Sequence, residues 1–139
     1  MKKVSKGLSL IEVLVSLIVL SVGVLGMAAL QVNSLKFNQT ASMRTHANFL
    51  AYDIADRMRA NRSKARAGSY DITMDAAAPS GSAMERVDLR EWKDKLASQL
   101  PDGKGAVSRD GKKAIITIVW DESRVGGSST EQFVYETQL

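Results

Sequence analysis

A charge-free apolar stretch near the N-terminus constrains this chain more than any other feature. Val13–Leu35 contains no charged residue, and its most apolar part is Val13–Leu30. A helix rises about 1.5 Å per residue, so about 20 such residues cross the hydrocarbon core of a bilayer. Lys2, Lys3 and Lys6 precede the stretch, and basic flanks stay on the cytoplasmic side. We therefore expect a single-pass anchor with a cytoplasmic N-terminus and an exported C-terminal part.

A cleaved secretory signal is the alternative explanation of this segment, because such a signal also begins basic and then turns apolar. Val13–Leu35 is longer than the apolar region of a typical signal, and no clear small-x-small pattern marks a cleavage site at its end. Ala28 and Ala29 lie near that end and keep the alternative open.

Glu12 is the one acidic residue at the edge of the apolar stretch. An acidic residue at the centre of a membrane helix costs roughly 2–3 kcal/mol, and less near the interface. The positive end of the helix dipole also favours a carboxylate in the first turn. Taken alone, Glu12 therefore has two equally acceptable interpretations: a functional carboxylate, or a carboxylate at headgroup level that has no function.

The residues before Glu12 change this interpretation. Lys6-Gly7-Leu8-Ser9-Leu10-Ile11-Glu12 resembles the signature of type IV prepilins, in which a basic leader ends in Gly and the fifth mature residue is Glu. The resemblance implies that prepilin peptidase cuts between Gly7 and Leu8, and that Leu8 is N-methylated. Residues 1–7 are then the leader, and residues 8–139 are the mature chain.

Cleavage at that position gives Glu12 a partner. It creates a positive α-amine at Leu8, one helical turn from Glu12. In a bundle of staggered helices Glu12 can meet the amine of a neighbouring subunit, and two charges desolvated together cost less than one alone. We expect the pair to fix the axial register. The resemblance also implies major and minor pilins and a pilus assembly platform as partners.

Composition limits the chemistry of the mature chain. Three of the 19 Lys and Arg residues precede Gly7, so 16 remain against 15 Asp and Glu. This near balance removes a general argument for nucleic-acid binding from charge. The chain has no Cys, and His46 is its only His, so Cys-ligated zinc and Ser–His catalysis have no support. We expect no enzyme activity, no metal and no cofactor.

Helical periodicity continues beyond the apolar stretch. Apolar residues recur at spacings of four, three, four and four: Met43, Ala47, Leu50, Ile54 and Met58. The pattern fades near Asn61, which could cap the helix C-terminus. We predict one helix from about Ser9 to Asn61, hydrophobic all round in its first half and amphipathic in its second. Gly23 and Gly26 in the first half favour close packing of helices.

The rest of the chain predicts a small head. Ala67–Met84 is rich in Gly, Ser, Ala and Asp and is typical of a loop. A second helix follows, with a stripe formed by Leu89, Trp92, Leu96 and Leu100. Asp88 and Glu91 have the spacing of a helix-start box, and Pro101-Asp102-Gly103 ends the helix.

Alternation of apolar residues predicts three strands, at Ala106–Arg109, Lys112–Trp120 and Glu131–Gln138. Asp110-Gly111 is the turn pair expected between the first two strands. One face of the second strand carries Ile116, Ile118 and Trp120, and one face of the third carries Phe133 and Tyr135.

The expected fold class is thus α+β and pilin-like. A long N-terminal helix packs on a three-stranded antiparallel sheet, with a short second helix. Residues 8–35 are expected to be the transmembrane and filament-core half of the helix, and residues 36–139 a periplasmic head that includes its amphipathic half. Before assembly the protein is expected in the inner membrane, and afterwards in a pilus at the cell surface.

Within the pilin superfamily, the chain is most similar to the PilV group of minor pilins, the type IV pilus modification proteins. The similarity rests on Gly23-Val24-Leu25-Gly26-Met27, Ala55–Asn61, Trp92, Leu96, Leu100-Pro101 and Ile118-Val119-Trp120. Many members of that group have longer heads with cysteines, and this chain departs from them in both respects. The resemblance implies a minor pilin in pilus assembly or initiation. A pseudopilin of type II secretion is the closest alternative.

A basic cluster ends the predicted long helix: Arg57, Arg59, Arg62, Lys64 and Arg66. Cations suit the C-terminus of a helix, so a solvated helix end is the simpler interpretation. A surface that binds DNA for uptake is the alternative function.

Overall fold

The computed structural model describes residues 9–139, and its longest element is the helix α1 (Leu10–Ala60), which has 51 residues. Its bounds agree with the predicted helix from Ser9 to Asn61. The chain divides into two compact units, one that ends at Phe37 and one that comprises Asn38–Leu139. The first unit is the apolar part of α1, in which every residue from Leu10 to Phe37 is exposed in the single chain.

The second unit contains the remaining elements and confirms the α+β fold. The C-terminal part of α1 is followed by α2 (Arg62–Arg66), α3 (Met84–Gln99), β1 (Lys104–Asp110), β2 (Lys113–Trp120), the 3-10 helix η1 (Ser123–Val125) and β3 (Glu131–Gln138). The strands form an antiparallel sheet in the order β1-β2-β3. This is the predicted meander.

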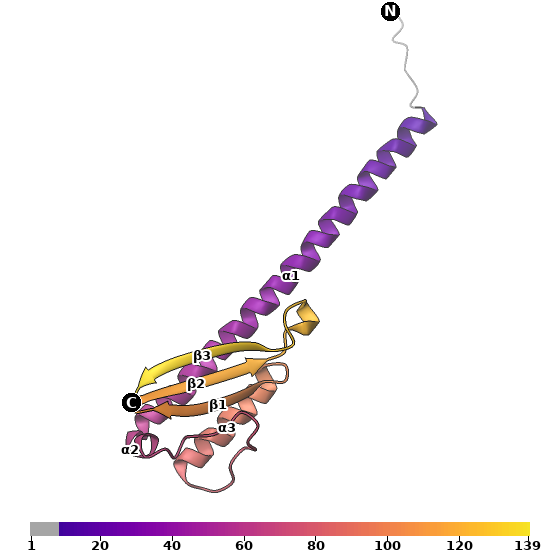
Figure 1. The fold of residues 1–139 in the computed structure, drawn as a ribbon. Helices are drawn as coiled ribbons and strands as arrows, with labels where there is room; N and C mark the ends of the chain where they lie inside the picture. The colour runs from indigo at the N-terminus through magenta and orange to yellow at the C-terminus, as the bar shows by residue number, and fades with distance from the viewer. Residues whose placement is uncertain (1–8) are drawn as a thin grey trace, which may run out of the picture. The chain divides into compact units, whose positions relative to one another are not determined.

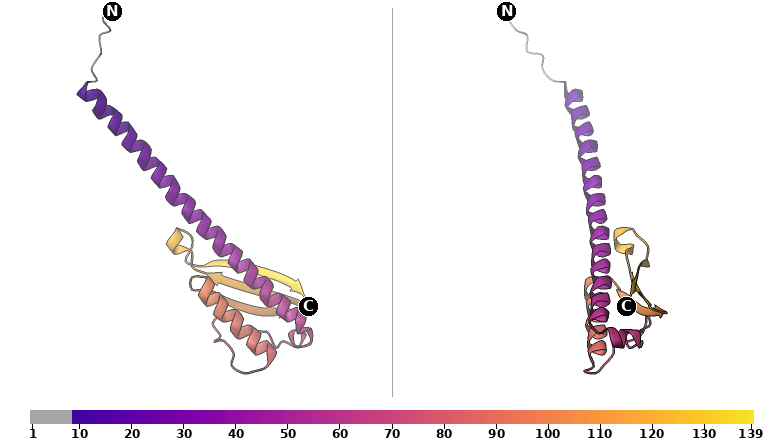
Figure 2. Two further views of the ribbon diagram at one scale, coloured as in Figure 1. Left: turned by 180° about the vertical axis from the view of Figure 1, so that it is seen from behind. Right: turned by 90° about the vertical axis from the view of Figure 1, so that its left-hand side faces the viewer.

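Both long helices of the second unit lie on one face of the sheet, with α1 beneath β3 and α3 beneath β1 (Figures 1 and 2). Alternation places Ile116, Ile118 and Trp120 of β2 in the core, as predicted. The helices contribute the predicted stripes to the same core: Ala47, Leu50, Ile54 and Met58 of α1, with Leu89, Trp92 and Leu96 of α3. The core therefore lies between one helical layer and one sheet.

Two local predictions about the ends of elements are wrong. The second helix begins at Met84 rather than at Asp88, and Asp88 is a buried residue inside it. The turn between β1 and β2 consists of Gly111 and Lys112, because Asp110 still pairs with Lys113 in the ladder. Gly111 has a φ of 59°, which suits the first position of a two-residue hairpin turn.

Asn61 does not end the helical region of the chain. Its φ is −112°, so it lacks the left-handed conformation of a C-terminal cap, and α2 follows at once. The loop before α3 also contains more structure than its composition predicts. Ile72 forms an antiparallel bridge with Val107 of β1, with both N–O distances at 2.9 Å.

Candidate assembly segment and polar network of the head

The first turn of α1 places Glu12 at the positive end of the helix. The carbonyl of Ser9 accepts hydrogen bonds from the amides of Glu12 and Val13, at 3.0 and 3.2 Å. The Glu12 side chain is exposed, so it is available to another subunit. Gly7 and Leu8, the predicted cleavage and methylation positions, lie outside the described residues, and these two assignments stay predictions.

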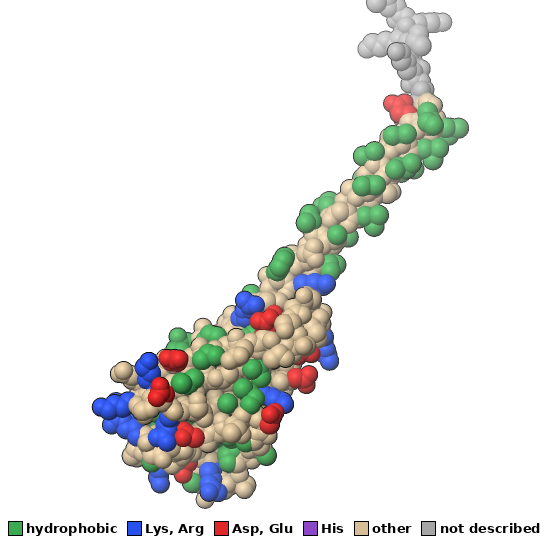
Figure 3. Space-filling view, in the orientation of Figure 1, with side chains coloured by type: hydrophobic (Ala, Val, Ile, Leu, Met, Phe, Trp, Pro, Cys, Tyr) green, Lys and Arg blue, Asp and Glu red, His purple; other side chains and the backbone are tan. Residues whose placement is uncertain are grey.

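The apolar part of α1 has the surface of a helix that lies in lipid or among other helices. Among residues 9–139, α1 is the one helix long and apolar enough to cross a membrane. Figure 3 shows hydrophobic side chains along it with few charges between them. The hydroxyls of Ser16 and Ser21 donate to carbonyls one turn earlier, each at 2.7 Å, so neither needs water. Added Cβ atoms at Gly23 or Gly26 would meet nothing within 4 Å of the single chain.

The five cations of the predicted basic cluster have different surroundings. Arg59 donates to Asp56 and to Thr137 of β3, at 2.6 and 2.5 Å. Arg66 donates twice to the carbonyl of Leu139, at 3.1 and 2.7 Å. These two side chains thus hold the end of the helical region against the sheet.

Arg62 and Lys64 differ from the other members of the cluster. Both are exposed on α2, and within residues 9–139 the side chain of neither forms a hydrogen bond or an ion pair, whereas Arg57, Arg59 and Arg66 each donate hydrogen bonds. The structure therefore does not bring the five cations together on one open surface.

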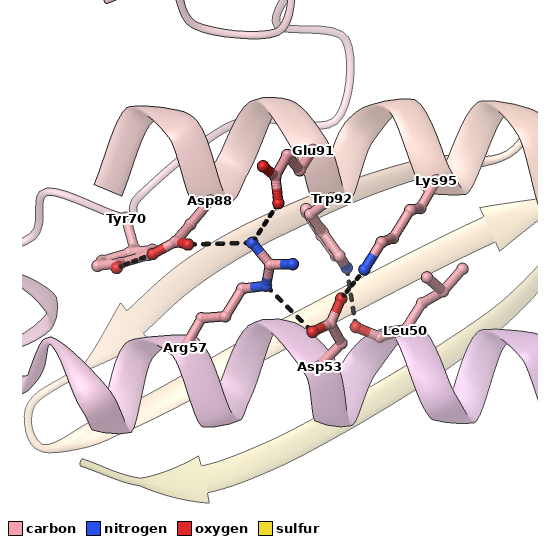
Figure 4. A network of polar contacts seen from close by, with 8 residues as sticks. All are labelled: Leu50, Asp53, Arg57, Tyr70, Asp88, Glu91, Trp92 and Lys95. Atoms are coloured by element: carbon pink, nitrogen blue, oxygen red, sulfur yellow. Dashed lines mark hydrogen bonds and ion pairs between the residues drawn. The ribbon is translucent and has the colours of Figure 1, made fainter. Parts of the chain in front are cut away.

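Arg57 is the centre of a polar network between α1 and α3 (Figure 4). Its Nε donates to Asp53 at 3.0 Å, and its Nη1 donates to Asp88 at 3.0 Å and to Glu91 at 2.8 Å. Asp53 also accepts from Lys95 of α3, at 2.8 Å. Positive and negative groups alternate along the contact between α1 and α3. These ion pairs fix the position of one helix relative to the other.

The network reaches the core through Asp88, which is buried on α3. One oxygen accepts from Arg57, and the other accepts from the hydroxyl of Tyr70 at 2.6 Å. Tyr70 is fully buried, and its hydroxyl accepts from the amide of Asn61 at 3.3 Å. A buried carboxylate is stable only with such partners.

The pKa values of these groups follow their contacts. Burial opposes the charge of Arg57, but hydrogen bonds to Glu91, Asp53 and Asp88 outweigh it and raise the Arg57 pKa above its ordinary value. Partial burial of Asp53 acts against its carboxylate, yet hydrogen bonds from Lys95 and Arg57 lower its pKa. Burial, together with the hydrogen bond to Asp88, raises the pKa of Tyr70 to about 12. Arg57 and Asp53 are therefore charged and Tyr70 is neutral near neutral pH.

A second buried contact joins the same helices. The indole Nε1 of Trp92 donates to the carbonyl of Leu50 in α1, at 2.8 Å. The helical stripes predicted that Leu50 and Trp92 are core residues, but the network around Arg57 was missed. Its only sequence signal was the i,i+4 pair of Asp53 and Arg57, which by itself is typical of a solvated helix surface.

The candidate metal-ligating side chains are dispersed over the described part of the chain. Within residues 9–139, no group of three or more His, Cys, Asp and Glu side chains is arranged to hold a metal ion. His46 is exposed on α1.

Comparison with known proteins places the similarity at the N-terminus. Residues 2–28 match the family model of the prokaryotic N-terminal methylation motif. That motif is typical of type IV pilin-like proteins, pseudopilins included, and it implies processing by prepilin peptidase and assembly with other pilins. With the apolar helix, it indicates membrane anchoring. No curated protein and no solved structure matched the chain.

Proposed function

We propose that this chain is a minor pilin of the PilV-like group, which enters a type IV pilus or takes part in initiating its assembly. One observation carries the proposal: Glu12 is exposed in the first turn of a helix that is otherwise charge-free to Leu35, and it lies within the residues that match the methylation motif. In lipid, a carboxylate at this position needs a cation as its partner. The α-amine that cleavage creates on Leu8 of a neighbouring subunit supplies that cation.

The mass of the mature protein tests the processing step. The chain isolated from filaments should lack residues 1–7 and carry one added methyl group. An intact N-terminus, or a cut near Ala28 and Ala29, would instead make the segment a plain anchor or a secretory signal.

Replacement of Glu12 tests the assembly step. Glu12→Ala should leave the chain in the membrane at the normal level but reduce its amount in sheared filaments by about tenfold or more, because the partner amine then stays unpaired. Ser16→Ala is the matched control, since that hydroxyl bonds only to its own helix. Normal incorporation of Glu12→Ala would contradict the proposed register pair.

A pseudopilin of type II secretion is the alternative supported by the same motif. The two roles differ in the filament that contains the protein. Fractionation of a strain that lacks the type IV pilus motor but keeps its secretion system separates them: a type IV pilin is then lost from the filament fraction, and a pseudopilin is retained.

DNA capture is a second candidate function, supported by the exposed cations Arg62 and Lys64. Their double replacement by Ala should weaken binding of a double-stranded oligonucleotide and reduce the slope of log K against log salt by about 2, while filament number stays normal. Arg57→Ala is unsuitable for this test, because it leaves Asp88 buried without its cation. Unchanged binding and slope would reject the role.

A further inference from the structure

The sheet of the head has one covered edge and one open edge. At β1, the bridge between Ile72 and Val107 continues the sheet, and Gly105 packs closely on Trp92 of α3. At β3, no further strand or bridge follows within residues 9–139.

The core is also open on the side of β3. Ile118 of β2 is fully buried, whereas its ladder partner Phe133 in β3 is only half-buried, and so is Tyr135. On the flank of α1 beside this edge, Phe49 is 68% exposed and Tyr52 is 45% exposed. The rings of Tyr52 and Tyr135 meet edge to face, with centroids 4.7 Å apart, at the border of the core.

Two hollows lie along this flank and share the side chains of Thr45 and Asn48. One has a volume of about 400 Å³ and extends to Phe133 of β3. The other, of about 110 Å³, is lined further by Phe49 and Tyr52. We call the surface formed by these five residues the α1–β3 groove.

Of the features that usually prevent strands from pairing between proteins, the open edge has only two charged side chains, Glu131 and Glu136. Edge strands are commonly protected by Lys, Pro, a bulge or a very short length. β3 has eight residues, contains no Lys, Arg or Pro, and keeps an unbroken register with β2. It is a regular template for a further strand.

We propose that β3 and the α1–β3 groove receive an extended segment of a different filament subunit. The segment adds a fourth strand beside β3, so that its inward side chains cover Phe49 and Tyr52. Backbone hydrogen bonds supply affinity in this mode of recognition, and alternate side chains supply specificity. This inference rests on the proposed function, because the partner is a subunit of the same filament.

The chemistry of the groove specifies the segment. Inward positions beside Phe133 and Tyr135 favour apolar residues. On the outer face Glu136 has only a loose, exposed pair with Lys113, at 3.7 Å, so a Lys or Arg is favoured opposite it. The expected segment therefore alternates apolar residues inward with at least one basic residue outward.

A second copy of this chain fits the edge poorly. The C-terminal part of α1 and β3 run in nearly the same direction (Figures 1 and 2). A symmetric pair joined β3 to β3 would run its two strands antiparallel, and the C-terminal parts of its two α1 helices would then be antiparallel as well. Copies in the proposed filament are related by rotation about one axis and a rise along it, which does not reverse their direction along that axis.

The absence of cysteine allows a direct test by thiol labelling. Single cysteines are introduced in the full-length chain as Asn48→Cys, in the groove, and as Met84→Cys, an exposed position outside it. A maleimide reagent is applied to the detergent-solubilised chain and to washed filaments. We expect labelling at position 48 to be about tenfold slower in filaments, with little change at position 84. Equal rates at position 48 would overturn the proposal.

Charge substitutions provide the second measurement. Phe49→Lys should reduce the amount of the chain in filaments several-fold, whereas Met84→Lys should not, although the two native side chains are similarly exposed, at 68% and 64%. Equal incorporation of both variants would overturn the proposal.

Three further outcomes identify which idea has failed. In a symmetric β3-to-β3 pair Val134 can face its own copy, so a disulfide dimer of Val134→Cys in filaments would make a second copy the occupant and overturn the proposal. Presence in filaments with free labelling at position 48 would overturn this inference alone. Absence of the unmodified chain from filaments would overturn the proposed incorporation into the pilus and this inference with it.

Discussion

At the scale of single residues, the head depends on a few polar groups whose partners are far away in sequence. Asp88 connects a half-buried cation, Arg57, to the fully buried hydroxyl of Tyr70. A buried carboxylate loses its water on folding, and each hydrogen bond replaces part of that hydration. The loss of one donor therefore costs more than the loss of an exposed pair.

Tyr70→Phe should lower the free energy of unfolding by about 1–3 kcal/mol near neutral pH, because Asp88 loses a donor in the core. The native chain should also lose stability in alkali. Between pH 10 and about 12 the unfolded chain releases the Tyr70 proton while the folded chain keeps it, so stability falls as pH rises. The fall should reach about 2–3 kcal/mol for this group.

Urea denaturation of the full-length chain in detergent at several pH values measures both effects. The Tyr70→Phe variant should lack the part of the stability loss in alkali that is assigned to Tyr70. Tyr52→Phe, on the exposed flank of α1, is the control and should keep that loss. An alkaline profile that is the same in Tyr70→Phe and the native chain would contradict the assignment.

At the scale of elements, close approaches hold the helices and the sheet together. β1 passes so near α3 that a Cβ atom on Gly105 would lie 2.4 Å from the ring of Trp92 and 2.6 Å from Leu96. Both neighbours are fully buried, so neither can move without disturbing the core. Glycine is needed here for space, since its φ is not in the left-handed region.

Gly105→Ala should destabilise the head by about 1–3 kcal/mol through overpacking. Ser108→Ala, at an exposed position of the same strand, is the control and should change little. Thermal unfolding followed by tryptophan fluorescence measures the difference. Equal stability of the two variants would mean that β1 and α3 are further apart than described.

Lys93 of α3 holds the loop that precedes its own helix. Its ammonium donates to three backbone carbonyls, those of Thr73, Met74 and Ala76, at 3.2, 2.9 and 3.0 Å. Burial lowers the Lys93 pKa, so the three carbonyls must hold a partly desolvated cation. One side chain thus orders a loop that composition alone would leave irregular.

Lys93→Met should leave the core intact and make the segment from Ile72 to Ala83 about tenfold more sensitive to proteolysis. Without the three hydrogen bonds of Lys93, local opening of this segment costs less free energy. Lys104→Met is the matched control: Lys104 pairs with Asp75 of the same loop, but the pair is exposed. Limited proteolysis with mass spectrometry detects the cut. Similar rates in both variants would show that Lys93 does not hold the loop.

At the scale of the whole molecule, the two compact units have different requirements. None of the described residues 9–37 of the first unit is buried within the single chain, and this segment therefore needs lipid or other subunits. The buried core of the other unit begins at Ala47, so all its members lie within Asn38–Leu139.

A fragment of residues 38–139 should therefore be soluble without detergent and unfold in one cooperative transition. It should also keep the alkaline loss of stability assigned to Tyr70. Size-exclusion chromatography and urea denaturation of the fragment, beside the full-length chain in detergent, check this. A fragment that needs detergent or unfolds without cooperativity would contradict an independent head.

The sequence by itself determined the features that depend on local periodicity. The apolar stretch, the helical stripe from Met43 to Met58 and the alternation in β2 each repeat with the period of their own element, so neighbours in sequence suffice to predict them. Glu12 and the methylation motif are equally local. The α+β class and the three-stranded meander followed from the order of these elements.

Only the tertiary structure decided which polar groups meet and which edge stays open. Asp88 had the spacing of a helix-start residue, but a core partner, Tyr70, and a cation on another helix, Arg57, place it inside α3. The same contact removes Arg57 from the predicted basic surface. These two pairs join residues 31 and 18 positions apart, and the pattern of a single segment carries no information about them. The free edge of β3 likewise exists only because nothing else in the described chain packs beside it.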